Sequence, residues 1–375
     1  MVDVIYIESE VIDHPRTKAI ADRYPKAKRI EIERYGEIFN SHAQNFRIQK
    51  NNPSLILAAK QNKKVMPTPA QYETGGGAHY YFSHMLNCVY DCRYCFLQGM
   101  LRSANYLVFV NYEDFVDEIR DIAKTHANDD KPAWFFSGYD CDSLAYEPVT
   151  NFADFFVPEF SSIPNAVLEL RTKSTQIRSL LKRPAQENVV IAYSLSPDRV
   201  AQEVEIGAPS MKKRIDALAK LQDKGWRIGL RFDPVIWHQD YLSDYQQMID
   251  HVFNQLDADR IDSVTLGGFR LPKGFYKTMR KLHPEHWLFS AGLDEKNAMV
   301  TYTQSIENEV LQNVGRMCEA HVSESKLFAY SSFDDESLGS KEKEGSQNKE
   351  GSQNKEGSQN KESNEEKGSQ QGAQT

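Results

Sequence analysis

Six short apolar runs alternate with amphipathic stretches through the middle of the chain. The runs are rich in the β-branched and aromatic residues that favour buried strands, and they span residues 80–85, 133–136, 167–171, 189–195, 228–232 and 263–266. The stretches between them include two with helical periodicity, and 112–124, for example, places Phe115, Ile119 and Ile122 on one face. This alternation predicts an α/β fold with a parallel sheet.

The number of repeats limits the architecture further. Six strand–helix units are too few to close an eight-unit barrel, so we predict an open, partial (β/α)6 barrel of the TIM type. Gly225 stands where the helix predicted at 211–224 needs a C-terminal cap, directly before the next strand. In such a sheet the reactive residues lie at the carboxyl ends of the strands.

The two ends of the chain differ from this central pattern. Residues 1–75 read as a small α/β domain of their own, joined at Gly75-Gly76-Gly77 to a main domain at 76–330. From residue 334 to 375 the chain is polar, repeats the hexapeptide Gly-Ser-Gln-Asn-Lys-Glu three times, and has ten acids against six lysines. We expect this tail to be disordered, because it has almost no apolar side chains with which to form a core.

Composition excludes several classes of protein. The tail carries −4 of the net charge of −8, which leaves the body mildly acidic and argues against nonspecific packaging of nucleic acid. No apolar run is long enough to span a membrane, and the first residues lack the pattern of a secretory signal. Five cysteines are too few for a disulfide scaffold. We therefore expect a cytoplasmic protein without a membrane partner.

Three of the five cysteines lie within eight positions, after the first strand of the predicted barrel. Cys88, Cys92 and Cys95 have the spacing of a short loop that wraps one face of a 4Fe-4S cluster and leaves one iron open for a small molecule. A structural zinc ion is an alternative, with Cys141 or His84 as the fourth ligand through the fold. A third interpretation is that the three cysteines are buried and bind no metal.

The pattern Cys-x3-Cys-x-aromatic-Cys, with Tyr94 as the aromatic residue, resembles the signature of radical S-adenosylmethionine (SAM) enzymes. The resemblance implies that the open iron binds SAM, and that one electron splits SAM into methionine and a 5′-deoxyadenosyl radical. It also implies a partial barrel of the radical SAM kind and places Tyr94 beside the cofactor, as a cofactor-binding and catalytic residue.

A closer similarity extends over about half of the chain. The stretch CVYDCRYCFLQGMLRSANYLVFVNYEDF resembles the cluster loop of the spore photoproduct lyase family, and the similarity continues from Trp134 to about Val235. It implies that Lys173 and Ser194, which follow the third and fourth strands, contact SAM. Ser196 stands where the family usually has Asn, and Ser137-Gly138 takes the place of small residues beside the amino group of the cofactor.

Members of that family reverse a thymine–thymine adduct in DNA, and the resemblance implies this reaction here. In the family a cysteine thiol quenches the product radical and tyrosines return the hydrogen atom. Two positions depart from this pattern. Phe96 replaces the tyrosine after the third cluster cysteine, and an ungapped comparison puts Tyr139 at the position of the donor cysteine. A two-residue insertion would bring Cys141 into that place instead.

The substrate-binding part departs further, because the late Arg-Tyr pair of the family is not found. The chain offers instead a stretch of basic and aromatic residues after the last strand, with Arg270, Lys273 and Tyr276 as candidates that track a phosphate backbone and stack a base. The alternative is an amphipathic helix with solvated cations. Arg231 either meets the carboxylate of the cofactor or pairs with Asp233.

These observations lead to one principal hypothesis and two alternatives. The principal one is a radical SAM lyase with a 4Fe-4S cluster that repairs a thymine photoproduct in DNA, reduced by a donor such as flavodoxin or ferredoxin. The first alternative is a sister radical SAM enzyme that acts on another nucleic acid or on a protein. The second is a non-catalytic nucleic-acid-binding protein with a structural metal.

Overall fold

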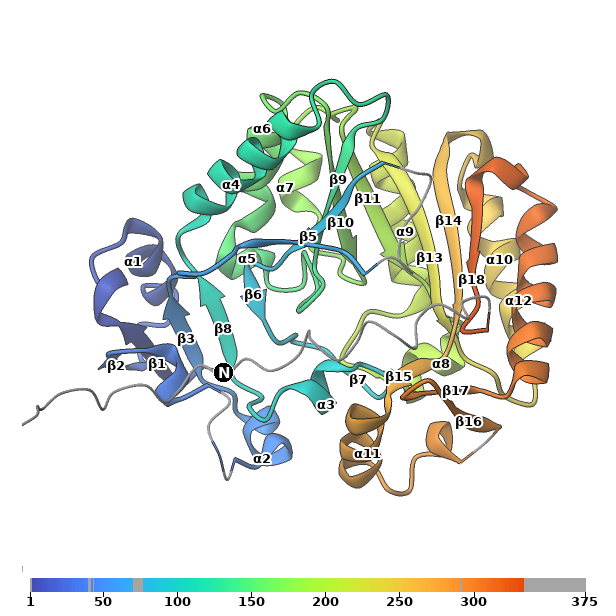
Figure 1. Cartoon of the computed structure of the whole chain (residues 1–375), viewed down its shortest axis with the longest axis horizontal. Coiled ribbons are helices and arrows are strands. Elements are labelled where there is room, and N and C mark those ends of the chain that lie inside the picture. Colours follow the sequence, from blue (N-terminus) through green and yellow to red (C-terminus); the bar gives the residue numbers. More distant parts are fainter. Residues whose placement is uncertain (1, 40–41, 43, 70–76, 291, 334–375) are drawn as a thin grey trace, which may run out of the picture. The chain divides into compact units, whose positions relative to one another are not determined.

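The six apolar runs form neighbouring parallel strands of one eight-stranded sheet in the computed structural model (Figure 1). In spatial order they are β5 (His79–Phe82), β9 (Ala133–Ser137), β10 (Ala166–Thr172), β11 (Val189–Ser194), β13 (Arg227–Val235) and β14 (Ile261–Gly268). Two edge strands were not predicted: β4 (Val65–Pro67) lies antiparallel beside β5, and β18 (Leu327–Tyr330) lies parallel beside β14. The predicted α/β partial barrel is confirmed.

The structure describes residues 2–39, 42, 44–69, 77–290 and 292–333. The tail at 334–375, which we expected to be disordered, lies outside the described residues. So do Gly75 and Gly76 of the predicted junction. Among the residues described, no helix combines the length and the apolar character that crossing a bilayer requires.

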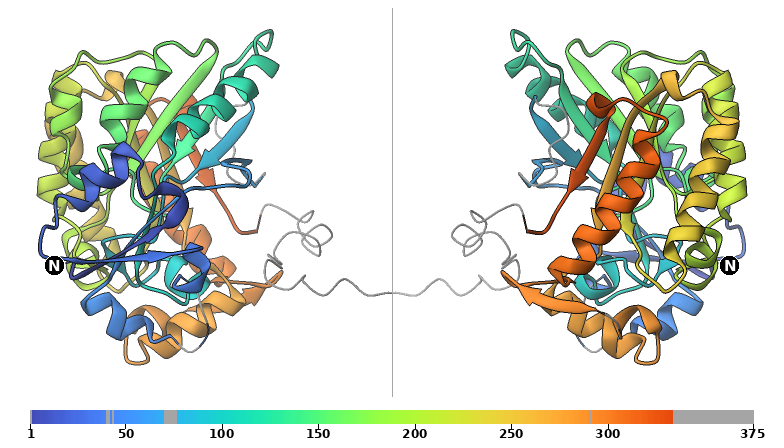
Figure 2. Two further views of the ribbon diagram at one scale, coloured as in Figure 1. Left: turned by 90° about the vertical axis from the view of Figure 1, so that its left-hand side faces the viewer. Right: turned by 90° about the vertical axis from the view of Figure 1, so that its right-hand side faces the viewer.

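Helices cover the outer face of the curved sheet (Figures 1 and 2). They are α4 (Tyr112–Thr125), α6 (Phe152–Phe160), α7 (Arg178–Leu181), α9 (Met211–Asp223), α10 (Tyr241–Gln255) and α12 (Gln304–Glu319). The helices predicted at 112–124 and 211–224 correspond to α4 and α9. Gly225 follows α9 with a φ of +95°, a conformation that glycine adopts without strain, so it ends the helix as predicted.

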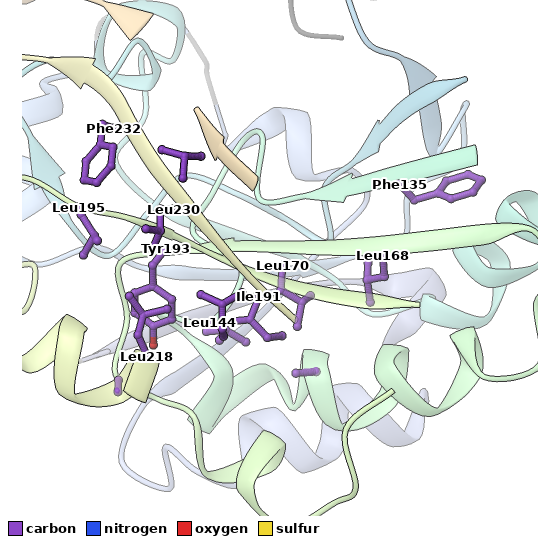
Figure 3. Packing of buried hydrophobic residues seen from close by; sticks show 14 of the residues in the cluster. Phe135, Leu144, Leu168, Leu170, Ile191, Tyr193, Leu195, Leu218, Leu230 and Phe232 are labelled. Atoms are coloured by element: carbon purple, nitrogen blue, oxygen red, sulfur yellow. The ribbon is translucent and has the colours of Figure 1, made fainter. Parts of the chain in front are cut away.

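The core lies between the sheet and these helices. Figure 3 shows Leu170 of β10 beside Ile191 of β11, with Leu168 further along β10, and all three are fully buried in the same apolar cluster. Because side chains alternate along a strand, Glu169 and Arg171 point to the opposite, inner face of the sheet. Each buried Leu or Ile contributes about 1.5–3 kcal/mol. The same alternation that stabilises the barrel thus brings charged groups into its interior.

A second sheet adjoins the barrel and has five strands in the order β2-β1-β3-β8-β6. The strands are β2 (Lys28–Ile32), β1 (Val4–Glu8), β3 (Leu55–Ala58), β8 (Tyr106–Phe109) and β6 (Met85–Leu86), and the helices α1 (Pro15–Ala21) and α2 (Phe46–Asn51) belong to the same part of the chain. This sheet combines strands from both sides of residue 75. The division into domains at 1–75 and 76–330 stays a prediction.

Short elements at the strand ends complete the fold. The chain pairs β7 (Asp91–Cys92) with β12 (Glu205–Ile206), and β15 (Arg270–Pro272) with β17 (Met299–Tyr302) and β16 (Leu293–Lys296). The helices here are α3 (Leu97–Met100), α5 (Glu147–Thr150), α8 (Asp198–Glu203) and α11 (Lys273–Leu282). Figure 1 shows β7, α3 and α11 grouped at one end of the barrel.

Candidate active site

The loop that carries the three cysteines is fixed by its backbone. Asn87 adopts a φ of +75°, and its side-chain amide Nδ2 donates to the backbone carbonyl oxygens of Ser103 (2.6 Å) and Asn105 (2.9 Å). Cys92 then forms part of β7, and the amide of Cys95 donates to the Cys92 carbonyl at 3.0 Å. The loop therefore starts and turns at defined points, which brings the three thiols into one region.

Cys92 is buried and Cys88 and Cys95 are partly buried, and this burial raises the pKa of all three thiols, that of Cys88 to about 12. Lys50 opposes the shift at Cys88, since its Nζ donates to the Cys88 carbonyl at 2.5 Å and lies close enough for the charges to interact. Lys173 opposes the shift at Cys92 and Cys95. Two ammonium groups thus face a region in which thiolates would be formed.

Within the described ranges, no set of three or more His, Cys, Asp or Glu side chains meets the geometry of a metal-ion site. The role of Cys88, Cys92 and Cys95 as ligands stays a prediction.

A buried carboxylate, Glu205, connects the cysteine loop to the strand ends. In the β7–β12 pair Glu205 lies opposite Cys92. Its Oε1 accepts hydrogen bonds from the Tyr94 hydroxyl and from Ser196 Oγ (3.0 Å), and Lys173 Nζ lies 4.0 Å away. Three of the predicted site residues therefore meet at one carboxylate that was not predicted from the sequence.

Arg214 of α9 completes this group. Its Nη2 lies 2.5 Å from Glu205 Oε2, and both side chains have no exposed surface. Burial alone would raise the pKa of the Glu205 carboxyl, but the charges of Arg214 and Lys173 outweigh it and hold the pKa below its usual range. Arg214 Nη1 also donates to the Ser194 carbonyl at 3.1 Å. We call Tyr94, Lys173, Ser196, Glu205 and Arg214 the Glu205 network.

A second group of polar residues lies where β9 and β10 end. Asp142 accepts from Thr172 Oγ1 and from the Lys173 amide, both at 2.6 Å. Ser137 Oγ and Ser143 Oγ are 2.7 Å apart. The loop after β9 is thereby bound to the strand end that carries Lys173, so the predicted residues Ser137 and Lys173 belong to one connected region.

Gly138 has a conformation and surroundings that exclude a side chain. Its φ is +84°, and a Cβ would lie 2.6 Å from Ser143 Oγ and 3.1 Å from the Arg171 carbonyl. We expect Gly138→Ala to lower the free energy of unfolding by about 1–3 kcal/mol, measured by urea denaturation. Gly274→Ala is the control, since a Cβ there meets nothing within 4 Å and helix α11 should tolerate it. Equal stability of the wild type and Gly138→Ala would contradict the expectation.

The two candidates for a hydrogen donor occupy different places. Cys141 is buried, with its Sγ 4.0 Å from Nδ1 of the buried His84, and burial raises the pKa of the thiol. Tyr139 is 37% exposed, and its ring lies 4.4 Å from Tyr81 and 5.5 Å from Phe96 between centroids. The aromatic group around Phe96 therefore includes a hydroxyl-bearing side chain although Phe96 has none.

Arg231 lies in the barrel interior and does not pair with Asp233, so that part of the prediction is wrong. Its Nη2 donates to Glu169 Oε2 at 2.7 Å, and its Nη1 and Nη2 each lie 3.1 Å from Ser263 Oγ. The reason is strand geometry: Glu169 and Arg231 both point to the inner face. The guanidinium of Arg231 is thus already bound by Glu169 and Ser263. Its role in cofactor binding stays a prediction.

The candidates for substrate binding also have partners. Arg270 forms a bidentate pair with Asp233, at 2.9 and 3.1 Å, and Lys273 pairs with Glu295. Tyr276 of α11 donates to the Phe289 carbonyl at 3.2 Å. The predicted alternative of an amphipathic helix matches α11, whose Met279 is buried while Lys277, Arg280 and Lys281 are exposed.

Glu205, Arg214 and Glu169 were not predicted from the sequence. Glu169 had a local signal, because it is a single acid inside the apolar strand 166–172. Arg214 had a weaker one, since it is adjacent to Ile215 on the apolar side of a helix. Glu205 lies in a short segment without periodicity, where nothing in the sequence indicated burial.

The curved sheet and the polar groups at its strand ends identify the class of the protein. It is an α/β partial barrel that holds its candidate reactive residues in the loops at the strand ends. The family model for spore photoproduct lyase matches residues 1–302. The chain therefore belongs to the spore photoproduct lyase family, a family of enzymes, and the alternative of a non-catalytic binding protein is set aside. The expected family resemblance is confirmed.

Individual relatives are more distant. The spore photoproduct lyase of Bacillus subtilis is 23% identical over 263 residues, which cover 68% of this chain and 72% of the relative. The lyase of a Geobacillus strain is 19% identical over 270 residues, or 70% of this chain and 76% of the relative.

Solved lyase structures show the same fold. The complex with the dinucleoside spore photoproduct superposes with a TM-score of 0.76, and a variant with bound AdoMet and photoproduct with 0.75. Both are 16% identical to this chain and cover 88% of it and 98% of the solved chain. At this identity the comparison supports the fold.

Proposed function

We propose that this chain is a radical SAM enzyme that repairs a thymine photoproduct in DNA. The observation that carries the proposal is the meeting of the cysteine loop with Tyr94, Lys173 and Glu205 at the strand ends, in a chain of the spore photoproduct lyase family. Hydrogen-atom abstraction from the lesion would start the reaction.

The cysteine loop supplies a donor set that fits a 4Fe-4S cluster. Three thiols from one loop leave one iron of such a cluster without a protein ligand. Ligand thiols must be deprotonated, and Lys50 and Lys173 favour this because their charges lower the pKa of the cysteines against the effect of burial. Zinc remains the alternative to be tested.

The Glu205 network and the loop after β9 would hold the cofactor. Lys173 offers an ammonium group to the methionine carboxylate, while Ser194, Ser196 and Ser137 offer hydroxyls to the ribose or amino group. Gly138, which has no Cβ, lets the loop after β9 pack closely against Ser143 and the Arg171 carbonyl. We assign Arg231 a positioning role between β10 and β13, because its guanidinium is bound to Glu169. When bound, the cluster and SAM would supply the 5′-deoxyadenosyl radical.

The substrate is proposed from the relatives, whose solved structures contain the dinucleoside spore photoproduct. The partners proposed are DNA with such a lesion and an electron donor such as flavodoxin or ferredoxin. We place the enzyme in the cytoplasm, since a cluster of this kind needs reducing surroundings. Phe96 favours a second candidate, a sister enzyme with another nucleic acid or protein substrate, because it lacks the hydroxyl of the family's tyrosine.

The deciding experiment is anaerobic reconstitution followed by assays of iron, 5′-deoxyadenosine and repair. With reductant, SAM and the dinucleotide photoproduct, we expect about four irons per chain, 5′-deoxyadenosine, and thymidylyl-thymidine. Stoichiometric zinc without SAM cleavage would refute the radical reaction. Cleavage of SAM without loss of the photoproduct would favour the sister enzyme.

Cys141 is the proposed thiol donor that quenches the product radical. We expect Cys141→Ala to leave SAM cleavage in place but to lower the fraction of substrate that becomes thymidylyl-thymidine, with side products in its stead, as resolved by chromatography. Tyr139→Phe tests the other candidate in the same assay. Unchanged product ratios in Cys141→Ala would remove Cys141 from the proposal.

A further inference from the structure

Helix α11 has two faces of opposite character. Phe275 and Tyr276 are partly buried and Met279 is fully buried, whereas Lys277, Arg280 and Lys281 are exposed. The three cations are spaced three and four residues apart, so they lie on one side of the helix. In the part of the chain that the structure describes, none of the three takes part in an ion pair or side-chain hydrogen bond. Their charges are therefore available to an external partner.

The helix is attached directly to the cysteine loop. A Cβ on Gly99 of α3 would lie 2.5 Å from the Phe275 Cα, so only glycine allows the two helices to approach this closely. At the end of α11, His283 Nε2 is 2.8 Å from Gln98 Oε1, and Gln98 in turn donates to the Cys92 carbonyl at 2.7 Å. The exposed cations are thus held at a fixed place beside the proposed reaction centre.

Two further arginines extend the positive charge next to α11. Arg47 and Arg93 both pair with the single carboxylate of Asp91, at 2.9 and 2.6 Å, which leaves a net positive charge in this group. Asp91 is adjacent to Cys92, whose carbonyl accepts from Gln98, the partner of His283, so both arginines lie near the end of α11. Burial lowers the pKa of His283 to about 4, so this side chain adds no charge at neutral pH. The local surface is cationic in a chain whose net charge is −8.

We propose that the exposed face of α11, through Lys277, Arg280 and Lys281, binds the phosphate backbone of the DNA strand that carries the lesion. This inference rests on the proposed function. At about 1.5 Å per residue, the segment from Lys277 to Lys281 spans about 6 Å, so the three cations face two or three consecutive phosphates. Such contacts fix the register of a strand without reading its sequence.

The test compares binding of a 20-nucleotide fluorescein-labelled oligothymidylate by fluorescence anisotropy over a range of KCl concentrations. We expect the variant Lys277→Gln/Arg280→Gln/Lys281→Gln to bind at least about tenfold more weakly near 0.1 M salt. The slope of log affinity against log salt should fall by about 2, since each phosphate contact to a single strand contributes about 0.7. Equal affinity and slope in the wild type and the variant would overturn the proposal.

Two matched variants exclude general effects of charge and folding. Lys213→Gln/Lys220→Gln/Lys224→Gln removes three exposed cations in and directly after α9, on the outer face of the sheet, and should bind like the wild type. Lys277→Arg/Arg280→Lys/Lys281→Arg keeps the charge of α11 and should also bind like the wild type. Equal weakening in the α9 variant would refute a specific role of α11.

A second readout separates this inference from the proposed function. Repair of the dinucleotide photoproduct should be equal in the wild type and the α11 variant, because a dinucleotide has a single internucleotide phosphate and no flanking backbone for the three cations to bind, whereas repair within a 20-nucleotide strand should decrease at low substrate concentration. If neither protein repairs either substrate, the proposed function fails. The anisotropy measurement still decides whether α11 binds a strand.

Discussion

Replacing Cys92 with alanine is expected to abolish both iron loading and SAM cleavage. Cys92 lies at the centre of the cysteine loop, is buried, and pairs with Glu205 across β7 and β12. With two thiols left, the loop cannot hold a cluster that needs three cysteines. We expect the iron content to fall by more than about tenfold and 5′-deoxyadenosine to fall below detection, because the cofactor carries the chemistry.

The matched control is Cys318→Ala. Cys318 is also a buried cysteine, but it lies in α12, far along the chain from the loop. Its replacement should cost about 1 kcal/mol of stability through lost packing and leave the iron content unchanged. Full iron content and cleavage activity in Cys92→Ala would show that the cysteine loop is not the ligand set.

Replacing Glu205 with alanine is expected to lower the free energy of unfolding by about 3–5 kcal/mol, since it leaves the Arg214 guanidinium buried without its counter-charge. Both side chains of this pair are completely buried. Urea denaturation measures the loss. The double variant Glu205→Gln/Arg214→Met should lose less stability than the sum of the losses in Glu205→Gln and Arg214→Met measured singly. Additive losses would contradict the direct pairing.

The pH dependence of this effect has a defined sign. The folded-state pKa of Glu205 lies below its ordinary value of about 4.3. The stabilisation is therefore complete above about pH 4.3 and is lost as the pH falls through the lower, folded-state pKa. The difference in stability between the wild type and Glu205→Gln should be constant from neutral pH to about pH 5 and shrink in more acidic solution.

The same carboxylate also orients Tyr94 and Ser196. A role in positioning predicts that Glu205→Gln raises the KM for SAM more than it lowers kcat, since an amide can keep the hydrogen bonds but not the attraction to Lys173. A purely structural role would leave the KM unchanged in the folded fraction.

The barrel was predictable because its signals are local. Each of the six inner barrel strands is a short apolar run, and the helices α4 and α9 repeat with the period of a helix; the six strands are β5, β9, β10, β11, β13 and β14. The cysteine loop was predictable for the same reason, since three cysteines within eight positions mark it. Gly225 could be assigned because the positive φ that follows a helix favours glycine.

The partners of the charged residues were not predictable, because they depend on which strands become neighbours. Arg231 is two residues from Asp233 in sequence, yet it pairs with Glu169, which is 62 positions away. Asp233 is bound instead by Arg270, 37 positions away. Both acids lie on the inner face, and only the arrangement of β10, β13 and β15 decides which arginine reaches which carboxylate.

The path of the chain between the two sheets makes the cysteine loop depend on both of them. After β5 the chain leaves the barrel, adds β6 and β8 to the N-terminal sheet, and returns to the barrel at β9. The cysteine loop lies on this excursion. The N-terminal strand β3 pairs with β8, the strand that follows the loop, so loss of the N-terminal strands would leave one edge of β8 unpaired. Selection on the cysteine loop should act on both sheets together.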